Sequence, residues 1–154
     1  MAYQYEYISL DDVLTKIVQQ AKKDVQWMEA QIPNNIDNAQ NLYLWLKSIT
    51  SYEDDPKDVE LIQSPKSLFL KNWYGVPGRG DCDCFSTLSI CCFVAMGYPL
   101  KSINIILTGR EEKIPCHIYT EIESIPFDLT NTFFGEIRNY PFFQKISIFD
   151  RWHV

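Results

Sequence analysis

The fold of this 154-residue chain is decided by residues 78–97, which read GRGDCDCFSTLSICCFVAMG. From Leu88 to Met96 no residue is charged, and in a helix the apolar side chains of this stretch point in every direction around the axis. A helix that is apolar all round belongs in the middle of a domain. Gly97, followed by Pro99, is expected to end it. We therefore expect a buried helix around which the rest of the chain is arranged.

Cys82 is expected at the N-terminus of this helix. Unpaired backbone N–H groups and the helix macrodipole favour a negative charge at that position. The pKa of a cysteine thiol falls from about 8.5 to roughly 3.5–7.5 when a cationic partner is also near. The stretch therefore predicts a reactive thiol on a rigid helix. Asp81 and Asp83 flank it and either cap the helix or, if they point inward, raise the pKa of the thiol.

Composition favours a soluble globular protein, since 46% of the residues are hydrophobic and 22% are charged. The length suits one domain, residues 1–154. Fourteen basic against twenty acidic residues give a net charge of −6, with no basic block, which argues against nucleic-acid binding. No apolar run approaches the ~18 residues of a membrane span, and the N-terminus does not read as a signal peptide.

The chain has five cysteines, of which four lie between positions 82 and 92. Cysteines spaced along one helix are poorly placed for disulfide bonds. We therefore expect free thiols in a reducing compartment, which favours a cytoplasmic location.

Helices are expected before the central one. Ser9 is placed to cap an amphipathic helix that runs to about Ile32, and a second helix is expected from about Asp37 to Ile49. A short helix from Pro65 to about Trp73 follows, with Ser64 as its cap. We thus divide the domain into an N-terminal helical part, residues 1–50, and a core part, residues 59–149.

After the central helix the pattern changes to strands. A buried strand is expected at 103–107, a charged hairpin turn at 109–113 and an alternating strand at 115–122, in which His117, Tyr119 and Glu121 share a face. Shorter strands are expected at 127–130 and 146–149. Helices first and strands second predict an α+β fold with an antiparallel sheet packed on the central helix.

A thiol nucleophile needs a base, and the base needs a group that orients it. His117 lies on one expected strand and Asp128 on the next. Neighbouring antiparallel strands can place such side chains together. We therefore expect the imidazole of His117 to reach Cys82, with Asp128 fixing its tautomer. The other histidine, His153, is next to last and is expected at the surface.

Four segments in this order carry a family resemblance: GDCDCFS at 80–86, MGYP at 96–99, HIYTE at 117–121 and FDLT at 127–130. Together they resemble the transglutaminase-like superfamily of cysteine enzymes, in particular compact bacterial and phage members with a Gly-Asp-Cys-Asp-Asp motif. The resemblance covers about Val59 to Thr130. It implies a papain-like core with Cys82 as nucleophile, His117 as base and Asp128 as orienting acid. Cys84 stands where the motif has its second aspartate.

The resemblance implies thiol-dependent acyl chemistry, which is hydrolysis of an amide bond or transfer of its acyl group, and leaves the substrate open. We expect a protein or peptide substrate. The resemblance implies neither a cofactor nor a metal ion. The oxyanion is expected to be held by the backbone N–H of Cys82 or Asp83 and by a side chain of the preceding segment. Gln63 and Trp73 are the candidates for that side chain, and Tyr119 is expected to wall the site.

Other interpretations remain open at this point. The main alternative is a catalytically silent structural protein on the same fold, such as a phage virion component, which would be found in the virion or another multi-subunit assembly. Cys84 competes with Cys82 as nucleophile. A metal site would gather Cys82, Cys84, Cys116 and His117, but it lacks a Cys-x-x-Cys pair. A thiol redox function is disfavoured for the same reason, because the sequence has no Cys-x-x-Cys pair.

Overall fold

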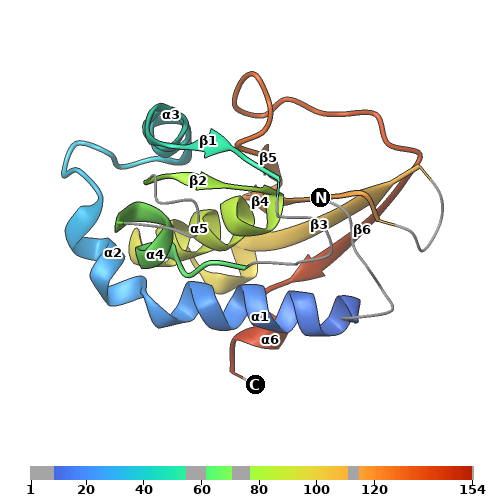
Figure 1. Cartoon of the computed structure of the whole chain (residues 1–154), viewed down its shortest axis with the longest axis horizontal. Coiled ribbons are helices and arrows are strands. Elements are labelled where there is room, and N and C mark those ends of the chain that lie inside the picture. Colours follow the sequence, from blue (N-terminus) through green and yellow to red (C-terminus); the bar gives the residue numbers. More distant parts are fainter. Residues whose placement is uncertain (1–8, 55–61, 71–76, 111–114, 154) are drawn as a thin grey trace.

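Helices precede the sheet along the chain, as expected (Figure 1). The computed structural model describes residues 9–54, 62–70, 77–110 and 115–153. The helices are α1 (Leu10–Lys23), α2 (Val25–Gln31), α3 (Ala39–Ile49), α4 (Pro65–Leu70), α5 (Cys82–Ala95) and α6 (Phe149–Trp152), with a 3-10 turn at Leu100–Ser102. The strands are β1 (Ser51–Tyr52), β2 (Arg79–Gly80), β3 (Ile103–Gly109), β4 (His117–Ile122), β5 (Ile125–Phe127) and β6 (Phe142–Ser147).

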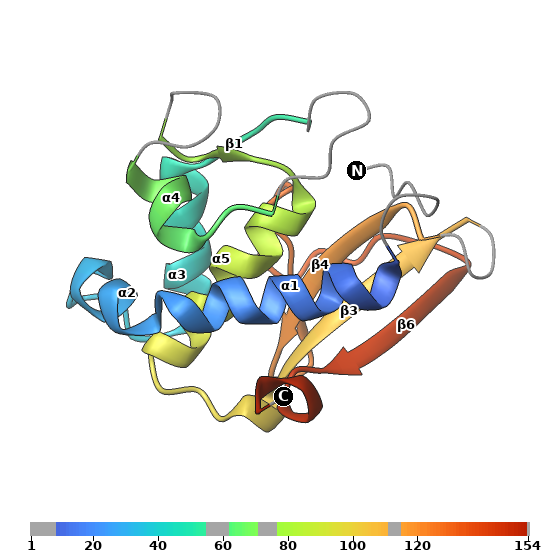
Figure 2. The ribbon, with the colours of Figure 1, turned by 60° about the horizontal axis from the view of Figure 1, so that its bottom comes forward.

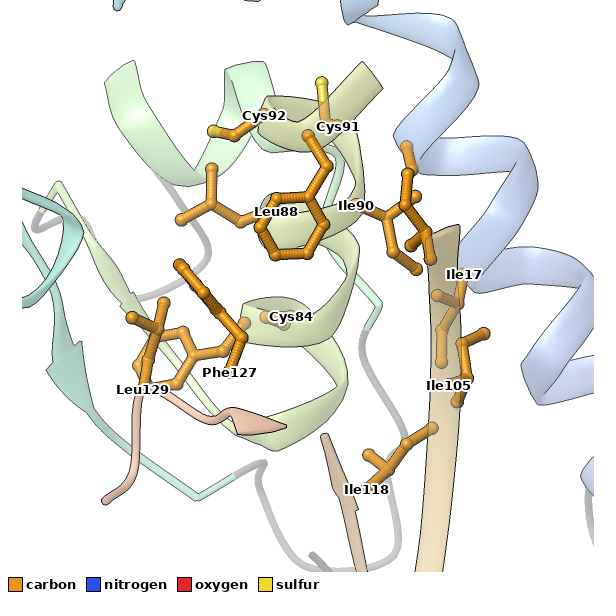
Figure 3. Packing of buried hydrophobic residues seen from close by; sticks show 14 of the residues in the cluster. Ile17, Cys84, Leu88, Ile90, Cys91, Cys92, Ile105, Ile118, Phe127 and Leu129 are labelled. Atoms are coloured by element: carbon orange, nitrogen blue, oxygen red, sulfur yellow. The ribbon is translucent and has the colours of Figure 1, made fainter. Parts of the chain in front are cut away.

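The central helix is α5, and every residue from Cys82 to Phe93 is buried. It packs against three other helices, α1, α2 and α4, and against strand β4 of the sheet (Figures 1 and 2). In Figure 3, Leu88 of α5 lies on the side of Phe127, while Ile90 lies on the side of Ile17. The expectation of a helix buried on all sides is confirmed.

The ends of α5 follow from local chemistry. At the start, Asp81 Oδ1 accepts hydrogen bonds from the backbone N–H groups of Asp83 (3.1 Å) and Cys84 (3.4 Å). At the end, Gly97 has φ +91°, a conformation that glycine adopts without strain. Gly80, just before the helix, allows a close approach, because a Cβ there would lie 2.8 Å from the Cβ of Cys84.

The four-stranded sheet has the order β5-β4-β3-β6, and all neighbouring strands are antiparallel. Alternate residues of β3 and β4 face the core, among them Ile105 and Ile118. The other face carries Glu121, whose carboxylate is bound by Asn104 (3.1 Å) and Lys145 (2.9 Å). A sheet with one apolar and one polar face is typical of antiparallel pairing. The α+β prediction, with an antiparallel sheet on the central helix, is confirmed.

The first expected helix is in fact two helices that meet at Asp24. The Asp24 side chain is buried, and its Oδ2 accepts the backbone N–H of Lys66 (2.9 Å) in the first turn of α4. A carboxylate at a helix N-terminus satisfies an unpaired donor and is favoured by the macrodipole. The expected caps are present, because Asp12 N–H donates to Ser9 Oγ and Ser67 N–H donates to Ser64 Oγ.

Two of the expected strands are shifted. The strand expected at 127–130 is β5, which begins at Ile125 because Glu123 and Ser124, with φ 50° and 66°, form a tight hairpin turn. The strand expected at 146–149 is β6, whose register against β3 runs from Phe142 to Ser147.

A short parallel pair, β1 with β2, lies outside the strands predicted from the sequence. It ties the end of α3 to the residues just before α5. The buried core draws on residues from Val13 in α1 to Ile148 before α6, so the N-terminal helices and the sheet contribute to the same core. Within the described segments, no helix combines the length and apolar character needed to cross a membrane.

Leu88 and Leu44 offer a matched test of this packing. Leu88 of α5 is fully buried, whereas Leu44 of α3 is 59% exposed. We expect Leu88→Ala to lower the free energy of unfolding by about 2–5 kcal/mol, since it leaves a cavity in the core. Leu44→Ala is expected to change it by less than about 0.5 kcal/mol. Urea unfolding followed by circular dichroism measures both, and equal effects would contradict a central position for α5.

Candidate active site

The N-terminus of α5 meets the edge of β4 where β5 has ended. The last pair between β4 and β5 joins Thr120 and Phe127, so the beginning of β4 extends past its neighbour. There the backbone N–H of Ile118 forms a hydrogen bond with the sulfur of Cys82. The thiol therefore occupies the hydrogen-bonding position on β4 that a longer β5 would have used. Ile118 directly follows His117, so Cys82 contacts the backbone of the residue after the one predicted to be its base.

The second element of the site is the pair of His117 and Asp128. Asp128 is the first residue after β5, and its Oδ2 lies 2.6 Å from His117 Nε2. Its other oxygen accepts hydrogen bonds from the Thr130 backbone N–H (3.0 Å) and hydroxyl (2.7 Å). The two side chains meet as predicted, although Asp128 lies in the turn after the strand and not opposite His117 in the ladder.

The charge state of Asp128 follows from its contacts. Burial by itself raises the pKa of this carboxyl, but the hydrogen bond and charge of His117 and the two bonds from Thr130 outweigh burial and hold the pKa below its usual value. Asp128 is therefore a carboxylate that orients the ring through Nε2. The nitrogen left to exchange a proton with a reacting group is Nδ1.

Two tyrosine rings stack on His117. The ring centroids of Tyr119 and Tyr140 lie 5.8 and 6.3 Å from that of the imidazole, at angles of 25° and 28°. Burial raises the pKa of Tyr119, with the charge of Asp128 adding to the effect. Tyr119 was expected to wall the site. Tyr140 was not, because it lies in the long segment between β5 and β6, where no periodic pattern shows which way a side chain points.

The expected lowering of the thiol pKa is wrong for this conformation. Burial raises the pKa of Cys82 well above its ordinary value, the charges of Asp83 and Asp81 raise it further, and only the Ile118 N–H among its described neighbours counteracts them. The side chain is 2% exposed. Loss of water disfavours the charged form of a thiol. Here this effect of burial is larger than the stabilisation of a thiolate by the helix N-terminus. Cys82 is thus a neutral thiol at rest.

Cys82 lies behind an open cleft. The space beside its sulfur, which is bordered by Ile118, Tyr119 and Asp128, has no room for a water molecule. Phe85 and Leu129 border both this space and a neighbouring cleft of about 440 Å³. That cleft is lined by Lys47, Thr50, Ser51, Tyr52, Phe85, His117, Leu129, Thr130 and Arg138. His117 therefore lines the cleft, whereas Cys82 borders only the smaller space, and Phe85 and Leu129 border both.

The oxyanion candidates are placed differently from what we expected. Gln63 Nε2 donates to the Arg79 carbonyl (3.1 Å) and contacts the sulfur of Cys84 (3.7 Å). Cys84 lies about 200° around the helix from Cys82, so these contacts do not support a role for Gln63 beside Cys82. The Asp83 backbone N–H already donates to Asp81. Trp73 lies outside the described residues.

The remaining cysteines and histidine are separate from the site. Cys84 packs against Gly80 on the side of α4, and Cys116 and His153 are exposed. Among the described residues, no group of three His, Cys, Asp or Glu side chains is arranged to hold a metal ion. All five cysteines are free thiols.

No protein-family model, no curated protein and no solved structure matches this chain. The description of the site therefore depends on the residues and their geometry.

Replacing Asp128 tests the state of the pair. Because the folded pKa of Asp128 lies below its unfolded value of 3.8, its stabilising effect is complete above that value and is lost as the pH falls through the folded pKa. We expect Asp128→Asn to lower the free energy of unfolding at pH 7 by about 1.5–3 kcal/mol, the range for hydrogen bonds to charged groups. Urea unfolding at pH 7, 5 and 3 measures the free energy of unfolding of the parent and the variant. The difference between the two should shrink only at pH 3. A difference that grows in acid would contradict a charged Asp128.

Replacing Asp81 tests the thiol. Asp81→Asn removes the negative charge and keeps an oxygen for the cap, so it should lower the pKa of Cys82 with little loss of stability. Asp81→Ala should lower the pKa as well but cost about 1 kcal/mol of stability through the lost cap. The pH dependence of iodoacetamide incorporation at Cys82, measured by peptide mass spectrometry, reports the pKa. Cys91, buried on the same helix, is the internal control. An unchanged profile in Asp81→Asn would show that Asp81 does not act on the thiol.

Proposed function

We propose that this chain is a cysteine hydrolase or acyltransferase that acts on an amide bond of a protein or peptide. Cys82 is the nucleophile, His117 the base and Asp128 the group that orients the base. The observation that carries the proposal is the 2.6 Å contact between His117 and Asp128 next to the strand edge against which the N-terminus of α5 places Cys82. A buried, hydrogen-bonded imidazole and carboxylate beside a cysteine is the arrangement that nucleophilic catalysis requires.

The arrangement of elements is also the one implied by the resemblance to transglutaminase-like enzymes. A cysteine begins the central helix, a histidine begins the strand that the helix contacts, and an acid follows the next strand. These features support a papain-like core as part of the proposal.

The neutral thiol at rest favours a general-base mechanism. When substrate binds, His117 Nδ1 accepts the proton of Cys82 as the sulfur attacks the amide carbonyl, and Asp128 stabilises the imidazolium that forms. The C–N bond then breaks, and His117 returns the proton to the leaving amine. Water or an acceptor amine attacks the thioester with His117 again accepting a proton, which releases the acyl product and restores the thiol.

The oxyanion has one candidate donor that the contacts favour. The backbone N–H of Cys82, at the first position of α5, lies where the helix dipole stabilises negative charge. The Asp83 N–H would join it only after leaving Asp81. Reaction further requires that Phe85 and Leu129 move, because they border both the cleft and the smaller space beside the thiol. A cleft of about 440 Å³ is within the usual range for ligand sites.

A catalytically silent structural protein is the second candidate. The observation that favours it is the 2% exposure of Cys82, since a thiol that is never reached by substrate cannot react. The two candidates differ in whether the thiol becomes accessible and responds to His117.

Iodoacetamide labelling distinguishes them. For the enzyme we expect Cys82 to react faster than Cys91 and Cys92, and His117→Ala to slow its reaction at least tenfold, since a general base contributes roughly 10²–10⁴ in rate. Cys84→Ser is the matched control on the same helix and should leave the rate at Cys82 unchanged. Peptides from a casein digest with hydroxylamine should also yield hydroxamates, which report a thioester. Equally slow labelling of all buried cysteines that does not change in His117→Ala would favour the structural protein.

A further inference from the structure

The cleft in front of His117 carries two positive charges from distant parts of the chain. Lys47 belongs to α3, and Arg138 belongs to the segment between β5 and β6. Thr50, Ser51, Tyr52 and Thr130 border the same space. The hydroxyl groups of Thr50, Tyr52 and Thr130 donate within the protein, to the Leu46 carbonyl, Asp54 and Asp128. None of the described residues that line the cleft is an aspartate or glutamate. Lys47 and Arg138 are therefore the charged side chains that the cleft presents.

The two cations are held close to one another by Asn131. Lys47 Nζ donates to the carbonyl oxygens of Leu129 (3.1 Å) and Asn131 (2.9 Å). Arg138 Nε donates to Asn131 Oδ1 (2.6 Å), and its Nη2 donates to the Thr130 carbonyl (3.0 Å). Both are exposed residues that contact the same buried asparagine, so they lie together at the turn after β5.

The partners of both cations are neutral oxygens, which fix the side chains without neutralising them. Elsewhere in the described chain, Lys145 pairs with Glu121 and Arg151 with Asp11. An ammonium group has three N–H donors and a guanidinium five, so both Lys47 and Arg138 retain donors beyond those used. Asp128 lies behind His117, where its oxygens already accept from His117 and Thr130.

We propose that Lys47 and Arg138 bind a carboxylate of the substrate, so that the chain acts on peptides with an acidic side chain or a free C-terminal carboxylate near the bond attacked. The planar guanidinium matches a carboxylate in geometry, and the ammonium adds a second charge-assisted bond. His117 lines the same cleft, which places the anchored group near the base. The catalytic meaning of this site rests on the proposed function, whereas the binding itself does not.

Binding is tested on the Cys82→Ala protein, which cannot turn over substrate. The probes are acetyl-Ala-Glu-Ala-amide, acetyl-Ala-Gln-Ala-amide and acetyl-Ala-Ala-Ala with a free carboxylate. The chain has two histidines, so NMR of the imidazole Hε1 protons gives one signal at the cleft, from His117, and one reference signal, from His153. We expect a carboxylate probe to shift the His117 signal and not the His153 signal. The Glu peptide and the free C-terminal acid distinguish the two sources of the carboxylate.

Variants assign the effect to the two cations. Lys47→Gln and Arg138→Gln should each weaken carboxylate binding about tenfold, as expected for the loss of one charge-assisted bond. Lys47→Arg keeps the charge and should retain most of the affinity. Lys145→Gln, a lysine on the polar face of the sheet, is the matched control and should bind like the parent.

Equal binding of the Glu and Gln peptides with no effect of the free acid would overturn the proposal, as would unchanged affinity in both Lys47→Gln and Arg138→Gln. These results do not depend on turnover. A failure here would leave the labelling of Cys82 as the separate test of the proposed reaction.

Discussion

The site depends on the early end of β5. This strand pairs with β4 only as far as Phe127, so the first residues of β4 have an edge that another part of the molecule can occupy. The N-terminus of α5 occupies it, with the Cys82 sulfur at the backbone N–H of Ile118. The chain turns at Asp128, and that turn brings its carboxylate to His117. Had β5 continued through residue 130, as the sequence pattern predicts, it would have competed with α5 for this edge.

Two opposing effects act on the thiol. The N-terminus of α5 favours a negative charge, but burial and the neighbouring carboxylates of Asp83 and Asp81 disfavour it, and the net effect is a raised pKa. Asp81 is needed for another reason, since it caps the helix that carries Cys82. The residue that caps the helix therefore also adds to the rise in the pKa of the thiol, after burial and Asp83.

The sequence was a good guide where one local rule dominates. An uncharged, apolar run predicts α5 because there is no polar face to turn outward, and the order of Cys82, His117 and Asp128 predicts a pair that the structure brings to 2.6 Å. It failed where distant parts of the chain decide the outcome. The break at Asp24 depends on an N–H group in α4, 42 residues away.

The cleft could not have been predicted for the same reason. Lys47 and Arg138 come together only because Tyr43 and Lys47 of α3 contact the turn after β5, where Tyr43 donates to the carbonyl oxygens of Asp128 (3.2 Å) and Asn131 (3.0 Å). Neither cation has a spacing in the sequence that relates it to His117. The pKa of Cys82 is raised where the sequence predicts a lowered one, because a helix position can be read from a pattern but the loss of water around a side chain cannot.

The carboxylates and the cations around the candidate site differ in exposure. Asp81, Asp83 and Asp128 are buried, and Lys47 and Arg138 line the cleft. In the proposed reaction this difference has a consequence for timing. An anionic group is attracted to the cleft and repelled by the buried carboxylates, so a bound carboxylate stays in front of His117 while the bond to be attacked passes Phe85 and Leu129. The thiol keeps its proton until that happens, because only an imidazole in contact with it can remove the proton in a site without water. In the proposed reaction, entry of the substrate and ionisation of Cys82 are therefore coupled.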